Sequence, residues 1–98
     1  MSKDKIIKKL KAELPALKKE YPIKTLGIFG SVARGDDTPK SDVDILVEFY
    51  ENKPVGFFKF IDLEENLSAL LDKKVDLVTK RALKPIIKQG ILNDVIYV

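Results

Sequence analysis

The sequence contains no cysteine and no histidine. The absence of cysteine excludes a disulfide framework and any metal site built from thiolates. The absence of histidine excludes histidine-ligated zinc and nucleophilic catalysis that relies on a histidine base. Any metal ion must therefore be held by oxygen atoms, which favours a hard cation such as Mg²⁺.

Long apolar runs are missing as well. No apolar segment approaches the roughly 18 residues that a membrane span requires. The first segment, MSKDKIIKKLKAEL, carries too much charge for a secretory signal. We therefore expect a cytoplasmic protein with no membrane association. The formal net charge of +3 would help to attract a polyphosphate or a nucleic acid, but it identifies neither.

Length and composition are those of one small domain. The chain has 98 residues, of which 45% are hydrophobic and 34% are charged. This composition is ordinary for a globular protein, and the length allows one modest core. We expect a single domain over residues 1–98.

Hydrophobic spacing predicts the order of helices and strands. Helical spacing covers residues 3–21, 56–71 and 85–92, and short apolar runs predict strands over 24–29, 42–49 and 75–78. The order implies an α/β (α+β) fold, in which a small mixed β-sheet carries helices packed on one face.

Three local features refine this prediction. Pro15 should kink the first helix or begin a second one. Ser31 should lie near the N-cap of a short helix that runs to Arg34. Residues 95–98 should form a terminal strand or an extended tail. Seven lysines between Lys3 and Lys19 are interpreted as the solvated side of an amphipathic helix, because no aromatic residues interleave with them, which argues against a nucleic-acid interface.

The most informative stretch, TLGIFGSVARGDDTPKSDVDILVEF, covers residues 25–49. Two apolar strands flank a Gly30-Ser31 corner, a turn-rich insert, and the acids Asp42 and Asp44. Side chains two residues apart on a strand leave the same face, with α-carbons about 6–7 Å apart. This spacing lets the two carboxylates converge on cations. The alternative is a pair of turn and cap residues that follow Ser41.

A third acid, Asp76, lies within the apolar run VDLV. An aspartate there would be costly if it were buried without a partner. Its position is reasonable if it points the same way as Asp42 and Asp44 and shares their cations. The alternative is an acid on an edge strand that simply faces solvent. Three neighbouring carboxylates would repel one another until divalent cations bind.

The Gly30-Ser31 corner supplies the hydrogen-bond donors that the acids lack. Glycine lets a phosphate approach the backbone closely, and the following N–H groups and the Ser31 hydroxyl can donate to it. Arg34 could reach a phosphate oxygen, or could instead form a salt bridge to one of the acids. Together these residues describe a cradle for a triphosphate beside two cations about 3.5–4 Å apart, the arrangement used for in-line displacement.

These motifs resemble a known signature. The segments GSVARG (30–35) and SDVDILV (41–47) resemble the signature of the DNA polymerase β-like nucleotidyltransferase superfamily, and most closely that of its minimal nucleotidyltransferases. The resemblance extends over nearly the whole chain, including Asp76 and the closing Ile-Tyr-Val. The spacing between Gly-Ser and Asp-x-Asp matches the family pattern without gaps.

The resemblance implies a specific chemistry and a partner. Members of this family have a nucleotidyltransferase (polymerase β palm-like) fold, bind ATP with two Mg²⁺ ions, and transfer a nucleoside monophosphate to a hydroxyl group. Asp42 and Asp44 would hold both metal ions, and Asp76 would hold the catalytic one and help to deprotonate the acceptor. Gly30 and Ser31 would hold the distal phosphates.

Minimal members are typically paired with a HEPN-domain ribonuclease toxin, and several are thought to adenylylate one of its tyrosines. The resemblance thus implies a protein adenylyltransferase that acts as a type VII-like antitoxin. Two alternatives remain open: an antitoxin that neutralises its partner by binding alone, and a nucleotidyltransferase for a small molecule or an RNA end. The chain ends soon after Asp76, so we expect a partner chain to complete the cleft in a hetero-oligomer.

Overall fold

The computed structural model describes residues 2–98, and its elements follow the predicted order. The helices and strands, in chain order, are α1 (Lys3–Glu20), β1 (Ile23–Phe29), α2 (Gly30–Arg34), β2 (Val43–Phe49), α3 (Phe57–Leu71), β3 (Val75–Thr79), the 3₁₀ helix η1 (Lys80–Ala82), α4 (Pro85–Asp94) and β4 (Ile96–Tyr97). No helix within residues 2–98 is long and apolar enough to cross a membrane.

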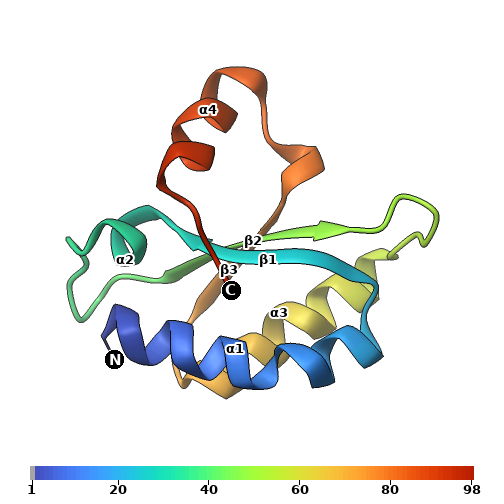
Figure 1. Cartoon of the computed structure of the whole chain (residues 1–98), viewed down its shortest axis with the longest axis horizontal. Coiled ribbons are helices and arrows are strands. Elements are labelled where there is room, and N and C mark those ends of the chain that lie inside the picture. The colour runs from blue at the N-terminus through green and yellow to red at the C-terminus, as the bar shows by residue number, and fades with distance from the viewer. Residues whose placement is uncertain (1) are drawn as a thin grey trace.

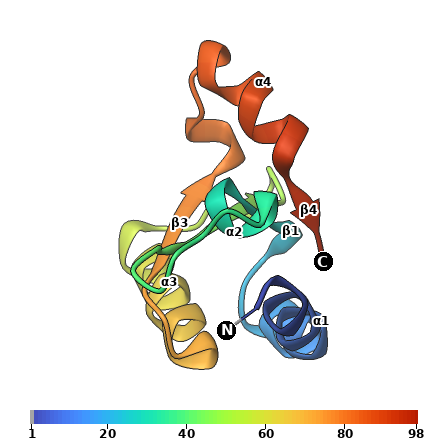
Figure 2. The ribbon, with the colours of Figure 1, turned by 90° about the vertical axis from the view of Figure 1, so that its left-hand side faces the viewer.

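The strands form one mixed sheet in the order β3-β2-β1-β4. β1 is antiparallel to both β2 and β4, whereas β2 and β3 are parallel. α1 and α3 lie side by side under one face of this sheet, and α4 lies on the opposite side (Figure 1, Figure 2). The mixed sheet with its long helices on one face confirms the predicted fold, and α4, which has no buried residue, is the exception.

The hydrophobic core fills the space between the sheet and the two long helices. Leu10 of α1 and Leu67 of α3 are fully buried, as are Ile28 of β1 and Ile45 of β2. Because side chains alternate along a strand, burial of one set of strand residues turns the other set to the far side of the sheet. The residues of β2 that alternate with Ile45 therefore face the side on which α4 lies.

One of the two alternatives for Pro15 was wrong. α1 is one helix over Lys3–Glu20 with Pro15 inside it, so the proline does not begin a second helix. Leu10 and Leu17, on either side of Pro15, are buried in the same core, and their packing outweighs the hydrogen bond that proline cannot donate. Ser31 lies near the N-cap of α2, as predicted: the helix begins at Gly30, and the cap residue is Phe29, which makes no side-chain hydrogen bond.

The short strand β4 pairs with β1 through a close approach at Gly27. A Cβ atom added at Gly27 would lie 2.8 Å from Cγ2 of Val95 and 3.0 Å from the carbonyl oxygen of Ile96. The β1–β4 pairing therefore requires glycine at this position.

We expect Gly27→Ala to destabilise the protein by about 1–3 kcal/mol, because β4 must move away from β1. Gly90 is the matched control, since a Cβ there meets no atom within 4 Å and the residue lies inside α4. Gly90→Ala should stabilise the protein by about 0.5–1 kcal/mol. Urea unfolding of both variants measures the difference, and equal midpoints would show that the approach at Gly27 does not constrain β4.

Candidate active site

Strand register places two of the three predicted acids side by side. Asp44 of β2 is paired with Asp76 of β3, and in a parallel pair such neighbours leave the same face of the sheet. Asp42 lies two residues before Asp44, just ahead of the first residue of β2. Val43 between them is fully buried on the helix side. The acids therefore lie on the side of the sheet away from α1 and α3, at the end where β2 and β3 begin.

The charges of these acids act on one another. Burial raises the pKa of Asp44 above its ordinary value, and the negative charges of Asp76 and Asp42 raise it further, whereas the Arg34 guanidinium lowers it. Asp42 itself lies near Lys74, with 3.8 Å between Oδ2 and Nζ, in an exposed pair that contributes little to stability. The result is a patch of mutually repelling carboxylates.

The chemistry of these donors fits a hard divalent cation. Every side chain offered is a carboxylate, and a doubly positive ion would relieve the repulsion that raises the pKa of Asp44. Within residues 2–98, however, no group of three or more histidine, cysteine, aspartate or glutamate side chains is placed so that it could hold a metal ion as it stands.

The backbone at Gly30 lies directly against this patch. Gly30 follows Phe29, which is paired with Asp44 across the β1–β2 ladder. Its φ of +74° lies in the left-handed region, and a Cβ atom there would collide with the Asp44 carboxylate. Both features require glycine. Ser31 follows in the first turn of α2, which is anchored by the buried Val32 and Ala33.

Arg34 is engaged with acids other than those predicted. Its Nε lies 3.2 Å from Oδ2 of Asp36 and its Nη1 lies 3.3 Å from Oδ2 of Asp94. These two carboxylates raise the pKa of Arg34. Both pairs are exposed, so Arg34 can exchange these partners for another anion at little cost. The contact with Asp94 joins α2 to α4 and spans 60 residues of sequence, so no local motif could have predicted it.

The family of the chain is clear from comparison with known proteins. The nucleotidyltransferase domain family matches residues 5–98, and the chain belongs to this family. A protein adenylyltransferase of Thermococcus cleftensis, MntA, is 45% identical over 89 residues, which cover 91% of this chain and 88% of that protein. The chain is therefore an enzyme of the nucleotidyltransferase class, as the motifs predicted.

Two solved structures share the fold. One, provisionally assigned as a minimal nucleotidyltransferase, superposes with a TM-score of 0.80 at 30% identity over 98% of this chain and 95% of the other. The second is a toxin–antitoxin crystal structure containing AMP-PNP, with a TM-score of 0.69 at 26% identity over 99% of this chain and 72% of the other. The resemblance to minimal nucleotidyltransferases is thereby confirmed.

The burial of Asp44, together with its repulsion by Asp76 and Asp42, predicts a stability change. A raised folded-state pKa means that the stability linked to this group is complete below its ordinary value of 3.8 and is lost as the pH rises through the folded pKa. At pH 7 and without divalent metal, Asp44→Asn should therefore melt about 2–5 °C higher than the unchanged protein. The gain should shrink towards zero near pH 3–4.

Glu65→Gln is the matched control for this experiment, because it removes one negative charge from an exposed position on α3. It should leave the melting temperature within about 1 °C. Thermal unfolding followed by circular dichroism in EDTA makes the comparison. If Asp44→Asn melts at or below the temperature of Glu65→Gln, the carboxylates do not strain the fold.

The contact between Gly30 and Asp44 predicts a loss of function. Gly30→Ala should reduce nucleotidyl transfer by roughly 10²-fold or more, because the new methyl group displaces the Asp44 carboxylate and disfavours the left-handed backbone. Gly35 also has a positive φ, of +79°, but a Cβ there meets no atom within 4 Å. Gly35→Ala thus imposes the same backbone strain without the collision, and equal losses of activity in the two variants would contradict the proposed contact.

Proposed function

We propose that this nucleotidyltransferase transfers AMP from ATP to a hydroxyl group, specifically a tyrosine, of a HEPN-domain toxin in the cytoplasm, and so acts as its antitoxin. The observation that carries the proposal is the in-register pair of Asp44 and Asp76 beside the backbone of Gly30. This arrangement offers carboxylates and phosphate-binding donors on two sides of one point, which is what a nucleotidyl transfer requires.

The relatives support the choice of nucleotide and acceptor. The Thermococcus cleftensis relative is named a protein adenylyltransferase. The solved toxin–antitoxin structure contains AMP-PNP, an analogue of ATP. A protein acceptor also agrees with the exposed Asp76, which a macromolecule can reach without entering a closed cleft.

Each site residue has a proposed role. Asp42 and Asp44 would hold two Mg²⁺ ions, and Asp76 would hold the one nearer the acceptor. When bound, these ions would supply positive charge that stabilises the developing negative charge on the phosphate oxygens. Gly30 and Ser31 would donate hydrogen bonds to the β- and γ-phosphates, and Arg34 would leave Asp36 or Asp94 to pair with a phosphate oxygen.

The reaction is an in-line displacement. The acceptor oxygen forms a bond to the α-phosphorus as the bond from that phosphorus to the bridging oxygen of the β-phosphate breaks, and pyrophosphate leaves. The proton of the acceptor hydroxyl passes to a carboxylate oxygen of Asp76. Gly30 and Ser31 hold the leaving pyrophosphate on the β1 side of the site, so the attacking oxygen approaches from the opposite side.

A second candidate function is neutralisation by contact alone. It is favoured by the unusually exposed apolar side chains on α3 and α4, where Phe58 is 87% exposed and Ile86 is 90% exposed. Exposed apolar side chains that gather in a patch often mark a site of contact with another protein. In this case the partner would be inactivated whether or not AMP is transferred.

The double variant Asp42→Asn, Asp44→Asn separates the two functions. With ATP, Mg²⁺ and the HEPN partner, the unchanged protein should add the mass of one AMP per modified tyrosine, as measured by intact mass spectrometry. The variant should lose at least about 10³-fold in rate, because the carboxylates that organise the phosphates are gone. If AMP is added to RNA instead, the proposal of a protein acceptor is wrong.

A matched control changes Asp4 and Asp72 to Asn. Both acids are exposed, Asp4 in the first turn of α1 and Asp72 at the C-cap of α3, so the two charges have opposite effects on their helices. This control should transfer AMP at the rate of the unchanged protein. If the Asp42, Asp44 variant still protects cells from the toxin as well as this control does, contact alone explains the antitoxin activity.

A further inference from the structure

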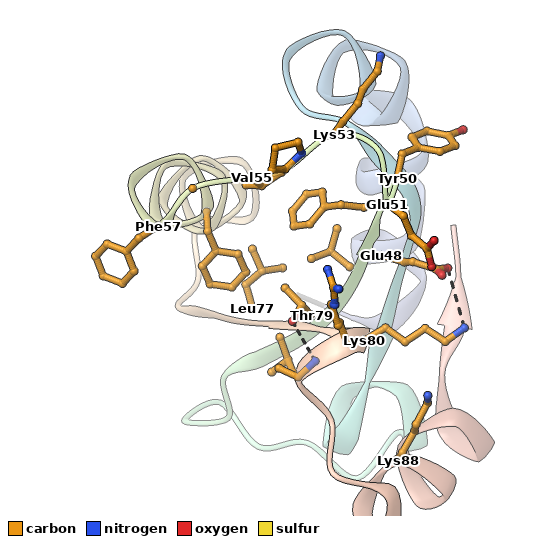
Figure 3. A pocket seen from close by; sticks show the side chains of 18 residues that line it. Glu48, Tyr50, Glu51, Lys53, Val55, Phe57, Leu77, Thr79, Lys80 and Lys88 are labelled. Atoms are coloured by element: carbon orange, nitrogen blue, oxygen red, sulfur yellow. Dashed lines mark hydrogen bonds and ion pairs between the residues drawn. The ribbon is translucent and has the colours of Figure 1, made fainter.

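A cavity of about 720 Å³ lies where the parallel strands β2 and β3 end (Figure 3). The three aspartates lie at the other end of these strands, where they begin. It is bounded by the last residues of β2, the loop that leads into α3, the end of β3 and η1, with Lys88 reaching in from α4. None of Asp42, Asp44 and Asp76 lines it. The proposed chemistry at the acids leaves this cavity without a role.

Positive charge exceeds negative charge around the cavity. Its positively charged lining residues are Lys53, Lys80, Arg81 and Lys88, and its negatively charged ones are Glu48 and Glu51. Lys80 lies 3.9 Å from a carboxylate oxygen of Glu48, and Figure 3 shows this pair at the wall of the cavity. Within residues 2–98, Lys53, Arg81 and Lys88 form no such ion pair. The surplus favours an occupant that carries negative charge.

The cavity is also lined by apolar and aromatic side chains. Leu77 is buried in its wall, whereas Tyr50 is 47% exposed and Phe57 is 72% exposed at its rim. Figure 3 shows Tyr50 and Phe57 on opposite sides of the opening. Exposed aromatic rings beside an arginine are typical of protein–protein interfaces, whereas a free phosphate would need only the charges.

Strand order indicates from which side a protein acceptor approaches. β2 lies between β1 and β3, so Gly30 at the end of β1 and Asp76 on β3 are on opposite sides of Asp44. In an in-line displacement the attacking and leaving oxygens are on opposite sides of the phosphorus. If the pyrophosphate leaves on the β1 side, the hydroxyl arrives over β3.

β3 leads directly into the cavity. Asp76 is four residues before Lys80, a distance of about 13 Å along an extended strand. When an acceptor protein presents its hydroxyl group to Asp76, the neighbouring part of its surface would therefore lie over the mouth of the cavity. A second nucleotide in the cavity would have no such connection to the reacting atoms.

We propose that this cavity is the docking site of the acceptor protein and binds a segment that combines acidic with apolar or aromatic side chains. The proposal rests on the proposed function, because it takes the acceptor to be a protein. Arg81 and Lys88 attract the acidic groups, and Tyr50 and Phe57 cover the apolar ones. The cavity thus selects the acceptor, whereas the aspartates perform the transfer.

The test uses the double variant Arg81→Glu, Lys88→Glu and the HEPN partner of the proposed function as the probe. Isothermal calorimetry without ATP measures binding, and the transfer assay measures KM for the acceptor and for ATP. We expect the Kd for the partner and its KM to rise by about tenfold or more, because attraction becomes repulsion. The kcat and the KM for ATP should stay within about twofold.

The matched control is Lys8→Glu, Lys11→Glu, which makes the same change in net charge on the exposed side of α1. It should change the Kd by no more than about twofold. Melting curves of both double variants verify that each is folded, since all four side chains reach solvent.

The outcomes separate the docking site from the proposed function. Equal Kd values for the cavity variant and the α1 control would overturn the docking site, as would a failure of the unchanged protein to bind the partner. A rise in the KM for ATP with unchanged partner binding would assign the cavity to the nucleotide and also overturn it. Binding that depends on Arg81 and Lys88 without any AMP transfer would support the docking site while refuting the proposed function.

Discussion

The alternation of side chains along β2 is the constraint on which the site depends. Val43 and Ile45 are fully buried against the helices, so Asp42 and Asp44 must leave the other face of the sheet. A register slip of one residue would exchange the two sets and place the carboxylates in the apolar core. The cost of an unpaired buried charge excludes that arrangement. The burial of Val43 and Ile45, rather than any contact made by the acids, thus determines the face of the sheet from which Asp42 and Asp44 project.

The two ends of the β2–β3 pair differ in charge. Its first residues bring together negative charges that destabilise one another, and its last residues open into a cavity with a surplus of positive charge. The core under the other face of the sheet is extensive enough to offset the repulsion at Asp44. α4 spans the outer side and is joined to α2 by the exposed Arg34–Asp94 pair.

Much of the fold follows from local pattern, because helical and strand periodicities are set by which residues must be buried. That logic locates α1, α3 and the three main strands, and it brings Asp76 to the same face as Asp44. It fails where packing between distant segments decides. Pro15 stays inside a helix because the core holds both flanking turns, and Arg34 meets Asp94 only through the tertiary position of α4. The cavity likewise has no sequence motif, since it is assembled from three separate stretches of the chain, 47–60, 77–82 and Lys88.

The central claim is that Asp42, Asp44 and Asp76 together hold divalent cations beside a nucleotide. The most direct measurement is a crystal structure of the protein grown with AMP-PNP and Mn²⁺, with data collected for the anomalous signal of manganese. The account predicts anomalous peaks in contact with the carboxylates of all three aspartates, with the distal phosphates against Gly30 and Ser31. Bound AMP-PNP with no manganese peak at these carboxylates would contradict it.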